Sequence, residues 1–276
     1  MSGRAGGRGS GARDAGGSPR RVTVSREGGV VTVTLDHPSR LNVLDMAGWD
    51  ALGTRFEELS GDDSVRCVVI TGAATRAFSA GSDIGAFGAQ RSTPEQVTRY
   101  ADAVRRGVEG VYRCPHPTVA VVRGVCVGGG LIIAACCDVT VCGESSRFGA
   151  PVNRLGATMA YEEMAPLLAA AGARAVLEIL LTGDLVDAHR ARQMGLVNRI
   201  VPDEGVEEAG AGIAHTIAKG APLVNRWHKK FVRRMADPRP LADEERAEAY
   251  EAFQTRDYSE GTAAFMEKRE PRFSGE

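Results

Sequence analysis

Two glycine-rich segments have the composition of turns that present backbone N–H groups. They are AFSAGSDIGAF, residues 77–87, and VRGVCVGGGLIIAACCD, residues 122–138, and each follows a run of β-branched residues. In the second, Gly128-Gly129-Gly130 precedes a helical run, so free N–H groups face outward where the helix dipole favours negative charge. Such donors can stabilise an oxyanion. The alternative is that the glycines only let the helix pack closely on a strand.

Other catalytic patterns are not supported. The segment GESSRFG, residues 143–149, lacks the spacing of a nucleophile elbow. None of the five histidines lies in a glycine turn or beside a candidate nucleophile: His37, His116, His189, His215 and His228. The six cysteines show no C-x-x-C spacing, and four of them lie in apolar runs. We therefore expect a reducing, cytoplasmic location and no zinc or other metal site.

Alternating strands and helices must position the two turns. A Val- and Thr-rich hairpin around Gly28-Gly29 is predicted over residues 22–36. Strands are then predicted at 65–71, 117–122 and 138–142, and helices at 45–59, 94–112 and 131–136. Strand signals disappear after residue 202, and helices follow at 206–219, 222–235 and 243–267. The pattern predicts an α/β core of short β-β-α turns over 22–205 and a helical C-terminal part over 206–276.

Composition excludes several classes of protein. With 276 residues and 43% hydrophobic content, the chain can bury a substantial core, so it is neither disordered nor fibrous. A formal net charge of −1 gives no overall attraction to nucleic acid or to an acidic membrane. The longest apolar stretch, residues 119–137, is broken by Arg123 and several glycines, so we expect no transmembrane segment.

The first 21 residues form a separate tail. Residues 1–21 hold five arginines, one aspartate and almost no apolar side chain, so we expect disorder. The tail has no hydrophobic segment of a secretory signal, and its glycines oppose the amphipathic helix of a transit peptide. Glycine and arginine are also typical of RNA-binding arms, yet no aromatic residue is interleaved for base stacking.

The two glycine turns, taken with their flanking segments, resemble the enoyl-CoA hydratase/isomerase (crotonase) family. The resemblance extends from residue 22 to residue 273. Six segments carry it: DHPSRLNVLD (36–45), VVITGAATRAFSAGSDI (68–84), CPHPTVAVVRGVCVGGG (114–130), ACCDVTVCGESSRFGAP (135–151), LLTGDLVDAHRARQMGLVNRIVP (180–202) and YSEGTAAFMEKREPRF (258–273). It implies a crotonase-like spiral of β-β-α turns, a C-terminal part that builds homotrimers or homohexamers, and an acyl-CoA substrate of lipid metabolism. Coenzyme A would be part of that substrate, with no separate cofactor.

The resemblance also assigns roles to individual residues. The two oxyanion N–H donors of the family fall on Ser82 and Gly129. Losing one such donor typically lowers the rate ~10²- to 10³-fold. Lys268 matches a lysine that contacts CoA phosphate from a neighbouring subunit, although it could equally be a solvated helix cation. The positions that correspond to substrate and CoA binding are Arg40, Leu41, Ala80, Asp83, Ile84 and Lys268.

The sequence departs from the family where hydratases carry two glutamates. Those positions are Ile132, two residues after the Gly-Gly-Gly turn, and Val152, directly after the proline of FGAP. A third position that some isomerases of the family use falls near Ala160. General acid–base groups contribute ~10²- to 10⁴-fold each, so we expect ordinary hydration to be slow or absent.

Glu162 and Glu163 are the nearest candidates for an acid or base. They begin a predicted helix whose apolar residues, Met164, Leu167 and Leu168, are expected to face inward. Glutamate in the first turn of a helix often only complements the dipole, which is the alternative for both. The other polar candidates near this loop are Tyr161, Asn153 and Arg154.

A cationic stripe is visible in the segment NRWHKKFVRRM, opposite Trp227 and Phe231. Its members share helical spacing: Arg226, Lys229, Lys230, Arg233 and Arg234. A solvated helix face is the simpler explanation, and binding of CoA phosphates is the alternative.

Three functions compete. The first is an enzyme that stabilises an acyl-CoA enolate as an isomerase, a decarboxylase or a C–C bond lyase. Decarboxylation is chemically attractive because the leaving carboxylate requires no enzymic base. The second is an acyl-CoA-binding protein without turnover, and the third is RNA binding through the tail.

Overall fold

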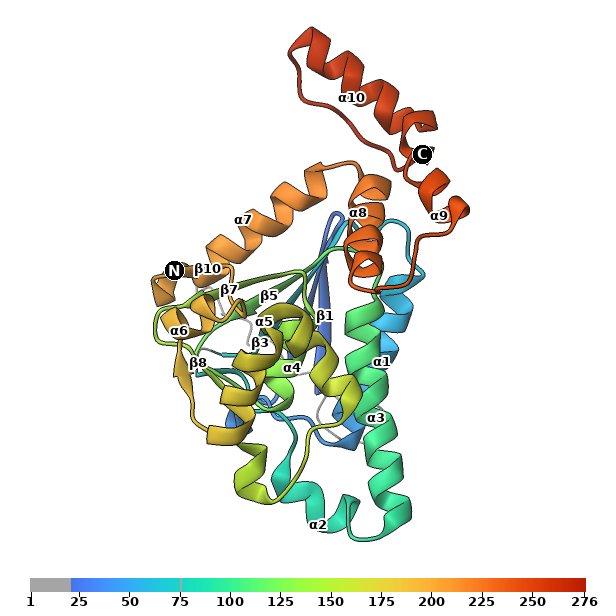
Figure 1. Cartoon of the computed structure of the whole chain (residues 1–276). Helices are drawn as coiled ribbons and strands as arrows, with labels where there is room; N and C mark the ends of the chain where they lie inside the picture. Colours follow the sequence, from blue (N-terminus) through green and yellow to red (C-terminus); the bar gives the residue numbers. More distant parts are fainter. Residues whose placement is uncertain (1–20, 75) are drawn as a thin grey trace, which may run out of the picture.

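A computed structural model describes residues 21–74 and 76–276 of the chain. The tail predicted over residues 1–21 lies outside the described residues except for Arg21, so its disorder and its RNA-binding role stay predictions. Two sheets, with helices packed around them, form the body, and the C-terminal helices rise from one end of it (Figure 1).

The larger sheet has the strand order β1-β2-β3-β5-β7-β10. β1 (Val22–Glu27) and β2 (Val30–Leu35) form the predicted antiparallel hairpin, in which Gly28 adopts a φ of 57°. All later pairings in this sheet are parallel. The remaining strands are β3 (Cys67–Gly72), β5 (Thr118–Val122), β7 (Val139–Gly143) and β10 (Arg199–Val201). β5 is buried along its whole length, as expected for a Val-rich strand with both faces covered.

The smaller sheet has the order β4-β6-β8-β9. Its strands are β4 (Ala77–Ser79), β6 (Val125–Val127), β8 (Arg147–Gly149) and β9 (Val186–Asp187). From β3 to β8 consecutive strands alternate between the sheets, and helical segments follow each pair, which confirms the predicted β-β-α turns. β4 and β6 run in parallel, so the two glycine turns that follow them begin at the same edge.

Three helices enclose this edge. α1 (Met46–Ser60) begins at Asp45, whose carboxylate accepts the Gly48 N–H at 2.9 Å. α3 (Pro94–Arg113) begins with a capping box between Thr93 and Gln96. α1 and α3 approach closely, because a Cβ at Gly53 would lie 3.1 Å from the Arg106 carbonyl carbon. α4 (Gly129–Cys136) is apolar on all sides and lies in the core.

Short elements connect these helices to the strands. The 3₁₀ segments are η1 (Pro38–Arg40), η2 (Ile84–Ala86), η3 (Pro151–Leu155) and η4 (Asp203–Gly205). The short helices are α2 (Phe87–Gln90) and α6 (Ala188–Gln193). η2 and α2 lead directly from the first glycine turn towards α3.

Among the described residues, one helix has the length and apolar composition to cross a membrane. This helix is α5 (Tyr161–Thr182). Gly172 interrupts it with φ 73° and ψ 164°, so neither half reaches the roughly 20 residues that a span requires. Met164 is partly buried and Leu167 is fully buried, as predicted, but Leu168 is exposed. That prediction was wrong because successive helical residues point about 100° apart.

The C-terminal part begins with two helices at the predicted bounds. α7 (Val206–Lys219) covers the second face of the larger sheet, where Val206 and Ile213 pack on β3 and β5. α8 (Pro222–Met235) follows. The single helix predicted over 243–267 is instead α9 (Asp243–Glu248), η5 (Glu251–Gln254) and α10 (Arg256–Glu267). The break occurs because Thr255 adopts an extended N-cap conformation and accepts the Tyr258 N–H.

Ion pairs within the chain engage the cationic stripe of α8. Lys229 and Arg233 both contact Asp138, with N–O distances of 2.7 and 2.8 Å. The other three pairs are Arg226 with Asp63, Lys230 with Glu248 and Arg234 with Glu245. The predicted solvated face is therefore wrong for most of the stripe. These side chains attach α8 to the body and to α9.

The Lys229–Asp138 pair gives a stability prediction. Lys229 is 7% exposed and also donates to His116 O at 2.7 Å, so Lys229→Met removes a buried charge from Asp138. We expect the free energy of unfolding in urea to fall by about 2 to 4 kcal/mol. Lys230→Met is the matched control, because Lys230 is 61% exposed and its pair with Glu248 should contribute at most about 1 kcal/mol. Equal losses in the two variants would contradict the anchoring role of Lys229.

Candidate active site

The two glycine turns touch through their backbones. Gly81 adopts a φ of 88°, and a Cβ placed there would lie 2.6 Å from the Gly129 nitrogen and 2.8 Å from the Val127 oxygen. A side chain at this position would therefore collide with the start of α4. Gly81 allows the segment after β4 to contact the segment after β6, which the parallel pairing of these strands brings together.

The Ser82 N–H is the free donor of the first turn. Its neighbours donate within the chain: Ala80 N to Leu41 O at 2.9 Å, Gly81 N to Ser79 Oγ at 3.0 Å and Asp83 N to Leu44 O at 2.8 Å. Within residues 21–74 and 76–276, the Ser82 N–H has no acceptor. The hydrogen bonds of its neighbours thus hold the Ser82 N–H in place and leave it available to a ligand.

The Gly129 N–H is the corresponding donor of the second turn. Gly128, at φ 56°, donates its own N–H to Gly149 O at 2.9 Å, and Gly129 is the first residue of α4. The Gly129 N–H likewise has no acceptor among the described residues. Two free N–H groups at adjacent positions, one of them at a helix start, form a suitable cradle for an anionic oxygen. The assignment of an oxyanion role to Ser82 and Gly129 stays a prediction.

The predicted CoA-binding residues of the core lie beside the Ser82 turn. Leu41 and Asn42 both adopt a φ of 54°, and the buried Asn42 amide donates to Ala73 O and Ala77 O at 2.9 and 2.8 Å. Arg40 Nη1 contacts the buried Asp83 carboxylate at 2.5 Å. The structure thereby brings together Arg40, Leu41, Ala80, Asp83 and the exposed Ile84.

Lys268 is not part of this group. It is an exposed residue that ends α10, and α10 lies at the end of the molecule opposite α2 (Figure 1). α2 continues directly from the Ser82 turn. A single chain therefore does not bring Lys268 to the other candidates, and its supply by a neighbouring subunit stays a prediction.

A cluster of polar aromatic groups surrounds Ser82. Trp49 Nε1 donates to Ser82 Oγ at 3.3 Å, and Tyr100 Oη donates to Leu44 O at 3.3 Å. Leu44 forms a parallel bridge with Ser82, so both aromatic residues converge on this turn. Burial raises the pKa of the Tyr100 hydroxyl, and hydrogen bonds with Ser82 and Trp49 oppose part of the change.

Sequence reasoning missed Trp49 and Tyr100. Both are fully buried and lie on predicted amphipathic helices, where a large aromatic residue usually belongs to the core. The Trp49 ring lies between the first residue of α4 and the middle of α3. A Cβ at Gly129 would lie 2.6 Å from Trp49 Cζ2, and one at Gly107 would lie 2.8 Å from Trp49 Cε3. Two glycines facing one tryptophan were the only signal in the sequence, and they are separated by 22 positions.

The two positions where hydratases of the family carry glutamates hold apolar side chains here. Ile132 lies in the buried part of α4, and Val152 lies half-buried in η3. The polar neighbours of Val152 are already engaged: Asn153 donates to Leu181 O at 2.9 Å, and Arg154 contacts Asp184 at 2.7 Å. Asn153 and Arg154 thus connect η3 to the C-terminal end of α5.

The two candidate glutamates differ in their surroundings. Glu162 is exposed and its charge acts on Arg105 of α3. Glu163 is partly buried, and its Oε2 accepts the Ala160 N–H at 3.1 Å. Burial raises the pKa of the Glu163 carboxyl, while the Ala160 bond and the charge of Arg91 oppose part of the change. The raised pKa favours Glu163 over Glu162 as the acid–base candidate, and its role stays a prediction.

The cysteines are poor candidates for covalent chemistry. All six are unpaired thiols. Burial raises the pKa of Cys67, Cys136 and Cys142 to about 12, so these groups stay protonated. Among the described residues, no group of three or more His, Cys, Asp and Glu side chains could hold a metal ion.

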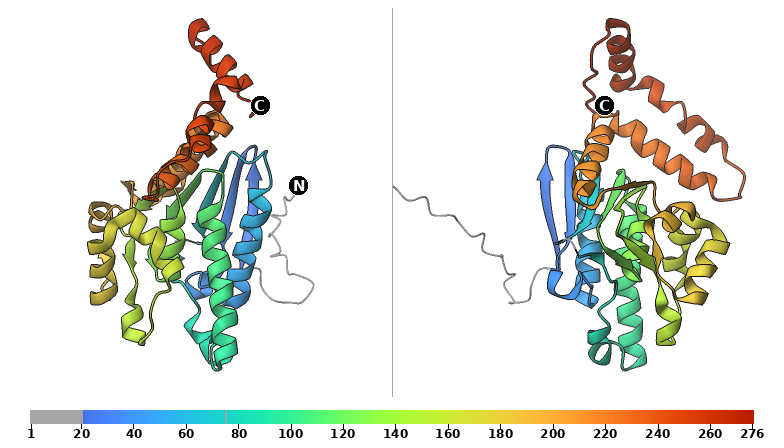
Figure 2. Two further views of the ribbon diagram at one scale, coloured as in Figure 1. Left: turned by 45° about the vertical axis from the view of Figure 1, so that its right-hand side comes forward. Right: turned by 90° about the vertical axis from the view of Figure 1, so that its left-hand side faces the viewer.

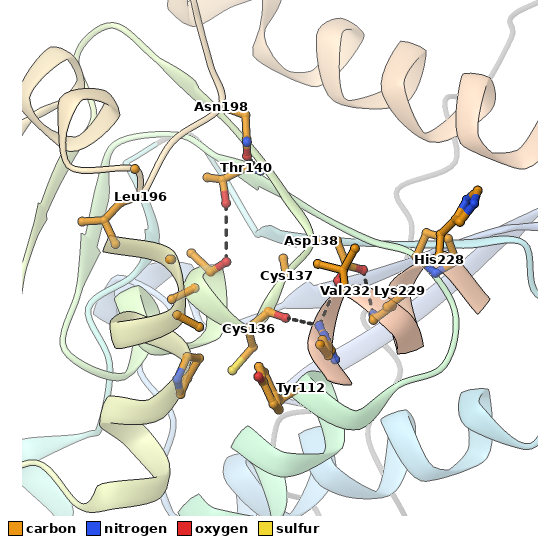
Figure 3. A pocket seen from close by; sticks show the side chains of 18 of the residues that line it. Tyr112, Cys136, Cys137, Asp138, Thr140, Leu196, Asn198, His228, Lys229 and Val232 are labelled. Atoms are coloured by element: carbon orange, nitrogen blue, oxygen red, sulfur yellow. Dashed lines mark hydrogen bonds and ion pairs between the residues drawn. The ribbon is translucent and has the colours of Figure 1, made fainter. Parts of the chain in front are cut away.

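A cavity of about 520 Å³ lies elsewhere, at the C-terminal end of α4 (Figure 3). Asp138 lies at its wall and is engaged by Lys229 and Arg233, while Thr140 donates to Ala134 O at 3.4 Å. Neither Ser82 nor any of the glycines Gly128, Gly129 and Gly130 lines this cavity. It belongs to the docking region of α8 and not to the candidate active site.

Comparison with known proteins gives one family. The model of the enoyl-CoA hydratase/isomerase family matches residues 25–276. A Thermus thermophilus protein, named provisionally as an enoyl-CoA hydratase, is 36% identical over 253 residues, which cover 90% of this chain and 98% of that protein. The 2,3-dehydroadipyl-CoA hydratase of Escherichia coli is 31% identical, with 92% and 98% covered. The crystal structure of an enoyl-CoA hydratase/carnithine racemase from Magnetospirillum magneticum has a TM-score of 0.91 and 43% identity, covering 94% of this chain and 97% of that one.

Proposed function

The chain belongs to the enoyl-CoA hydratase/isomerase family, and we propose that its Ser82 and Gly129 N–H groups bind the thioester oxygen of an acyl-CoA. The observation that carries this proposal is the contact between the two turns, in which the N–H groups of Ser82 and Gly129 have no acceptor among the described residues. These donors would stabilise an enolate, in which the thioester oxygen carries the negative charge.

We further propose that Glu163 is the single base and that the reaction shifts a double bond. The Glu163 carboxylate removes a proton from C2 of a 3-enoyl-CoA, and the electron pair passes to the thioester oxygen. The same carboxyl then returns the proton to C4, which leaves the 2-enoyl-CoA. The partial burial of Glu163 and its raised pKa support this role, as do the apolar side chains of Ile132 and Val152.

Hydration is the competing reaction, because relatives of this chain are named as hydratases. Hydration requires one group to deprotonate water and a proton to reach the α-carbon. Glu163 alone could serve both steps in turn, but no second carboxylate occupies position 132 or 152. Decarboxylation and C–C bond cleavage also use the enolate and remain further candidates. Relative rates on two substrates separate isomerisation from hydration.

The acid–base proposal predicts a difference between two neighbouring glutamates. Wild type should convert a 3-enoyl-CoA faster than it hydrates a 2-enoyl-CoA, and Glu163→Gln should lower isomerisation ~10²- to 10⁴-fold. Glu162→Gln is the matched control and should stay close to wild type, because Glu162 is exposed. A base must be ionised, so the rate should fall as the pH drops through the raised pKa of Glu163. This acid limb should lie above the usual range of a glutamate and disappear in Glu163→Gln.

Three outcomes would contradict this assignment. Rapid hydration of the 2-enoyl-CoA by wild type would show that two-step proton transfer occurs at this site. Isomerisation unaffected by both substitutions would exclude these glutamates and turn attention to Tyr161 or to Tyr100. Binding of acyl-CoA without any turnover would support the non-catalytic alternative.

The oxyanion proposal predicts opposite results for two substitutions of Ser82. Ser82→Ala keeps the backbone donor and removes only the hydroxyl that accepts from Trp49, so acyl-CoA binding and turnover should survive. Ser82→Pro removes the N–H and should lower turnover at least ~10²- to 10³-fold. Circular dichroism verifies that both variants fold. Unchanged activity in a folded proline variant would refute the assignment.

We also propose that the protein assembles as a homotrimer or a pair of trimers. α10 rises clear of the body, and its Phe265 and Met266 are 82% and 80% exposed (Figure 2). Leu177 and Leu181 of α5 are exposed as well. Apolar side chains on an unpartnered helix favour burial against another chain. We expect sedimentation at micromolar concentration to give a trimer or hexamer mass, and a stable monomer would contradict assembly.

A further inference from the structure

Arg91 lies between two aromatic rings beside the proposed thioester site. Its guanidinium carbon is 4.1 Å from the centroid of Phe87 and 3.9 Å from that of Tyr100. The two rings meet edge to face, at 5.8 Å and 83°. Cation–π contacts with two rings restrict the motion of this half-buried side chain.

The guanidinium of Arg91 has no acceptor in the described part of the chain. No hydrogen bond or ion pair within 4 Å joins it to residues 21–74 or 76–276. Arg40 and Arg154, by contrast, each contact an aspartate. Arg91 is not among the described residues that have a buried nitrogen without a partner, so its N–H groups are open to solvent and available to a ligand.

Arg91 is also close to the Ser82 turn. It stacks on the ring of Tyr100, whose hydroxyl donates to the oxygen of Leu44, the bridge partner of Ser82. One tyrosine side chain therefore separates the guanidinium from the turn that holds the thioester oxygen in the proposed function.

We propose that the acyl group of the substrate ends in a carboxylate that Arg91 binds, so that the substrate is the CoA thioester of a dicarboxylic acid. The inference rests on the proposed function, because the thioester position defines where the acyl chain starts. A guanidinium fork matches a carboxylate with two parallel N–H bonds, which a neutral acyl end cannot accept. Arg91 therefore selects the substrate and takes no part in proton transfer.

Glu163 is the internal acid that could pair with Arg91 instead. Its carboxylate responds to the Arg91 charge, but Oε2 is engaged by the Ala160 N–H and no ion pair with Arg91 forms. Ala160, Arg91 and Glu162 are the groups that act on the Glu163 pKa. If Arg91 served only Glu163, Arg91→Met would raise the Glu163 pKa and move the acid limb of the rate to higher pH for every substrate alike.

The test compares matched acyl-CoAs on the full chain by calorimetry. Succinyl-, glutaryl- and adipyl-CoA are each paired with butyryl-, pentanoyl- or hexanoyl-CoA, the monocarboxylic thioester of the same length. We expect wild type to prefer at least one dicarboxylic member about 10- to 100-fold. Arg91→Met should abolish the preference and leave the affinity for the neutral thioester unchanged. Arg99→Met is the control, because Arg99 is an exposed arginine on α3 and should keep the preference.

The outcomes separate the two proposals. Equal affinity of wild type for both members of every pair overturns the carboxylate site alone. Arg91→Met could weaken the binding of both members of a pair equally, which would show that Arg91 acts through the fold. It could also shift the acid limb of the rate without changing the preference, which would show that Arg91 acts through Glu163. Either result overturns the carboxylate site. Failure of every acyl-CoA to bind wild type overturns the proposed function together with this inference.

Discussion

The parallel pairing of β4 with β6 is the constraint on which the candidate site depends. Parallel neighbours end at the same edge, so the two turns that follow them must share one small space. Only glycine fits there: a Cβ at Gly81 would lie 2.6 Å from the Gly129 nitrogen, and one at Gly130 would lie 2.3 Å from the Ser79 oxygen. The same close approach lies beside the N–H groups of Ser82 and Gly129, which have no acceptor in the part of the chain that the structure describes.

Burial of α4 determines where acid–base groups can be. The helix is apolar on all sides, and Ile132 packs within the core, so α4 contributes a backbone donor and no ionisable side chain. In the proposed function the proton-transfer group therefore comes from another element, the start of α5, which carries the partly buried Glu163. Aromatic residues of α1 and α3 complete the surroundings, because Trp49 and Tyr100 each combine a large apolar ring with one polar atom that finds a partner near Ser82.

Charge in this protein is used in two ways that sequence composition does not distinguish. On α8, most cations contact acidic partners, and Asp138 receives both Lys229 and Arg233 where the helix meets the body. Arg91 instead lies against two rings without an acidic contact in the described chain. Arginines and lysines that pair with carboxylates have their hydrogen-bond donors engaged, whereas a cation held by aromatic rings keeps its donors available.

The sequence by itself determined the elements, because helix and strand preference is encoded within a few residues. Helices at 206–219 and 222–235, the hairpin at Gly28 and the glycine turns at Ser82 and Gly129 were all predictable. Only the tertiary structure decided which elements meet. It placed Trp49 and Tyr100 at Ser82, Arg91 on its two rings and Lys229 on Asp138, contacts that join residues far apart in the chain. The local sequence pattern does not predict such contacts. A buried aromatic residue or a cation has the same helical spacing whether its helix borders a functional site or only packs in the core.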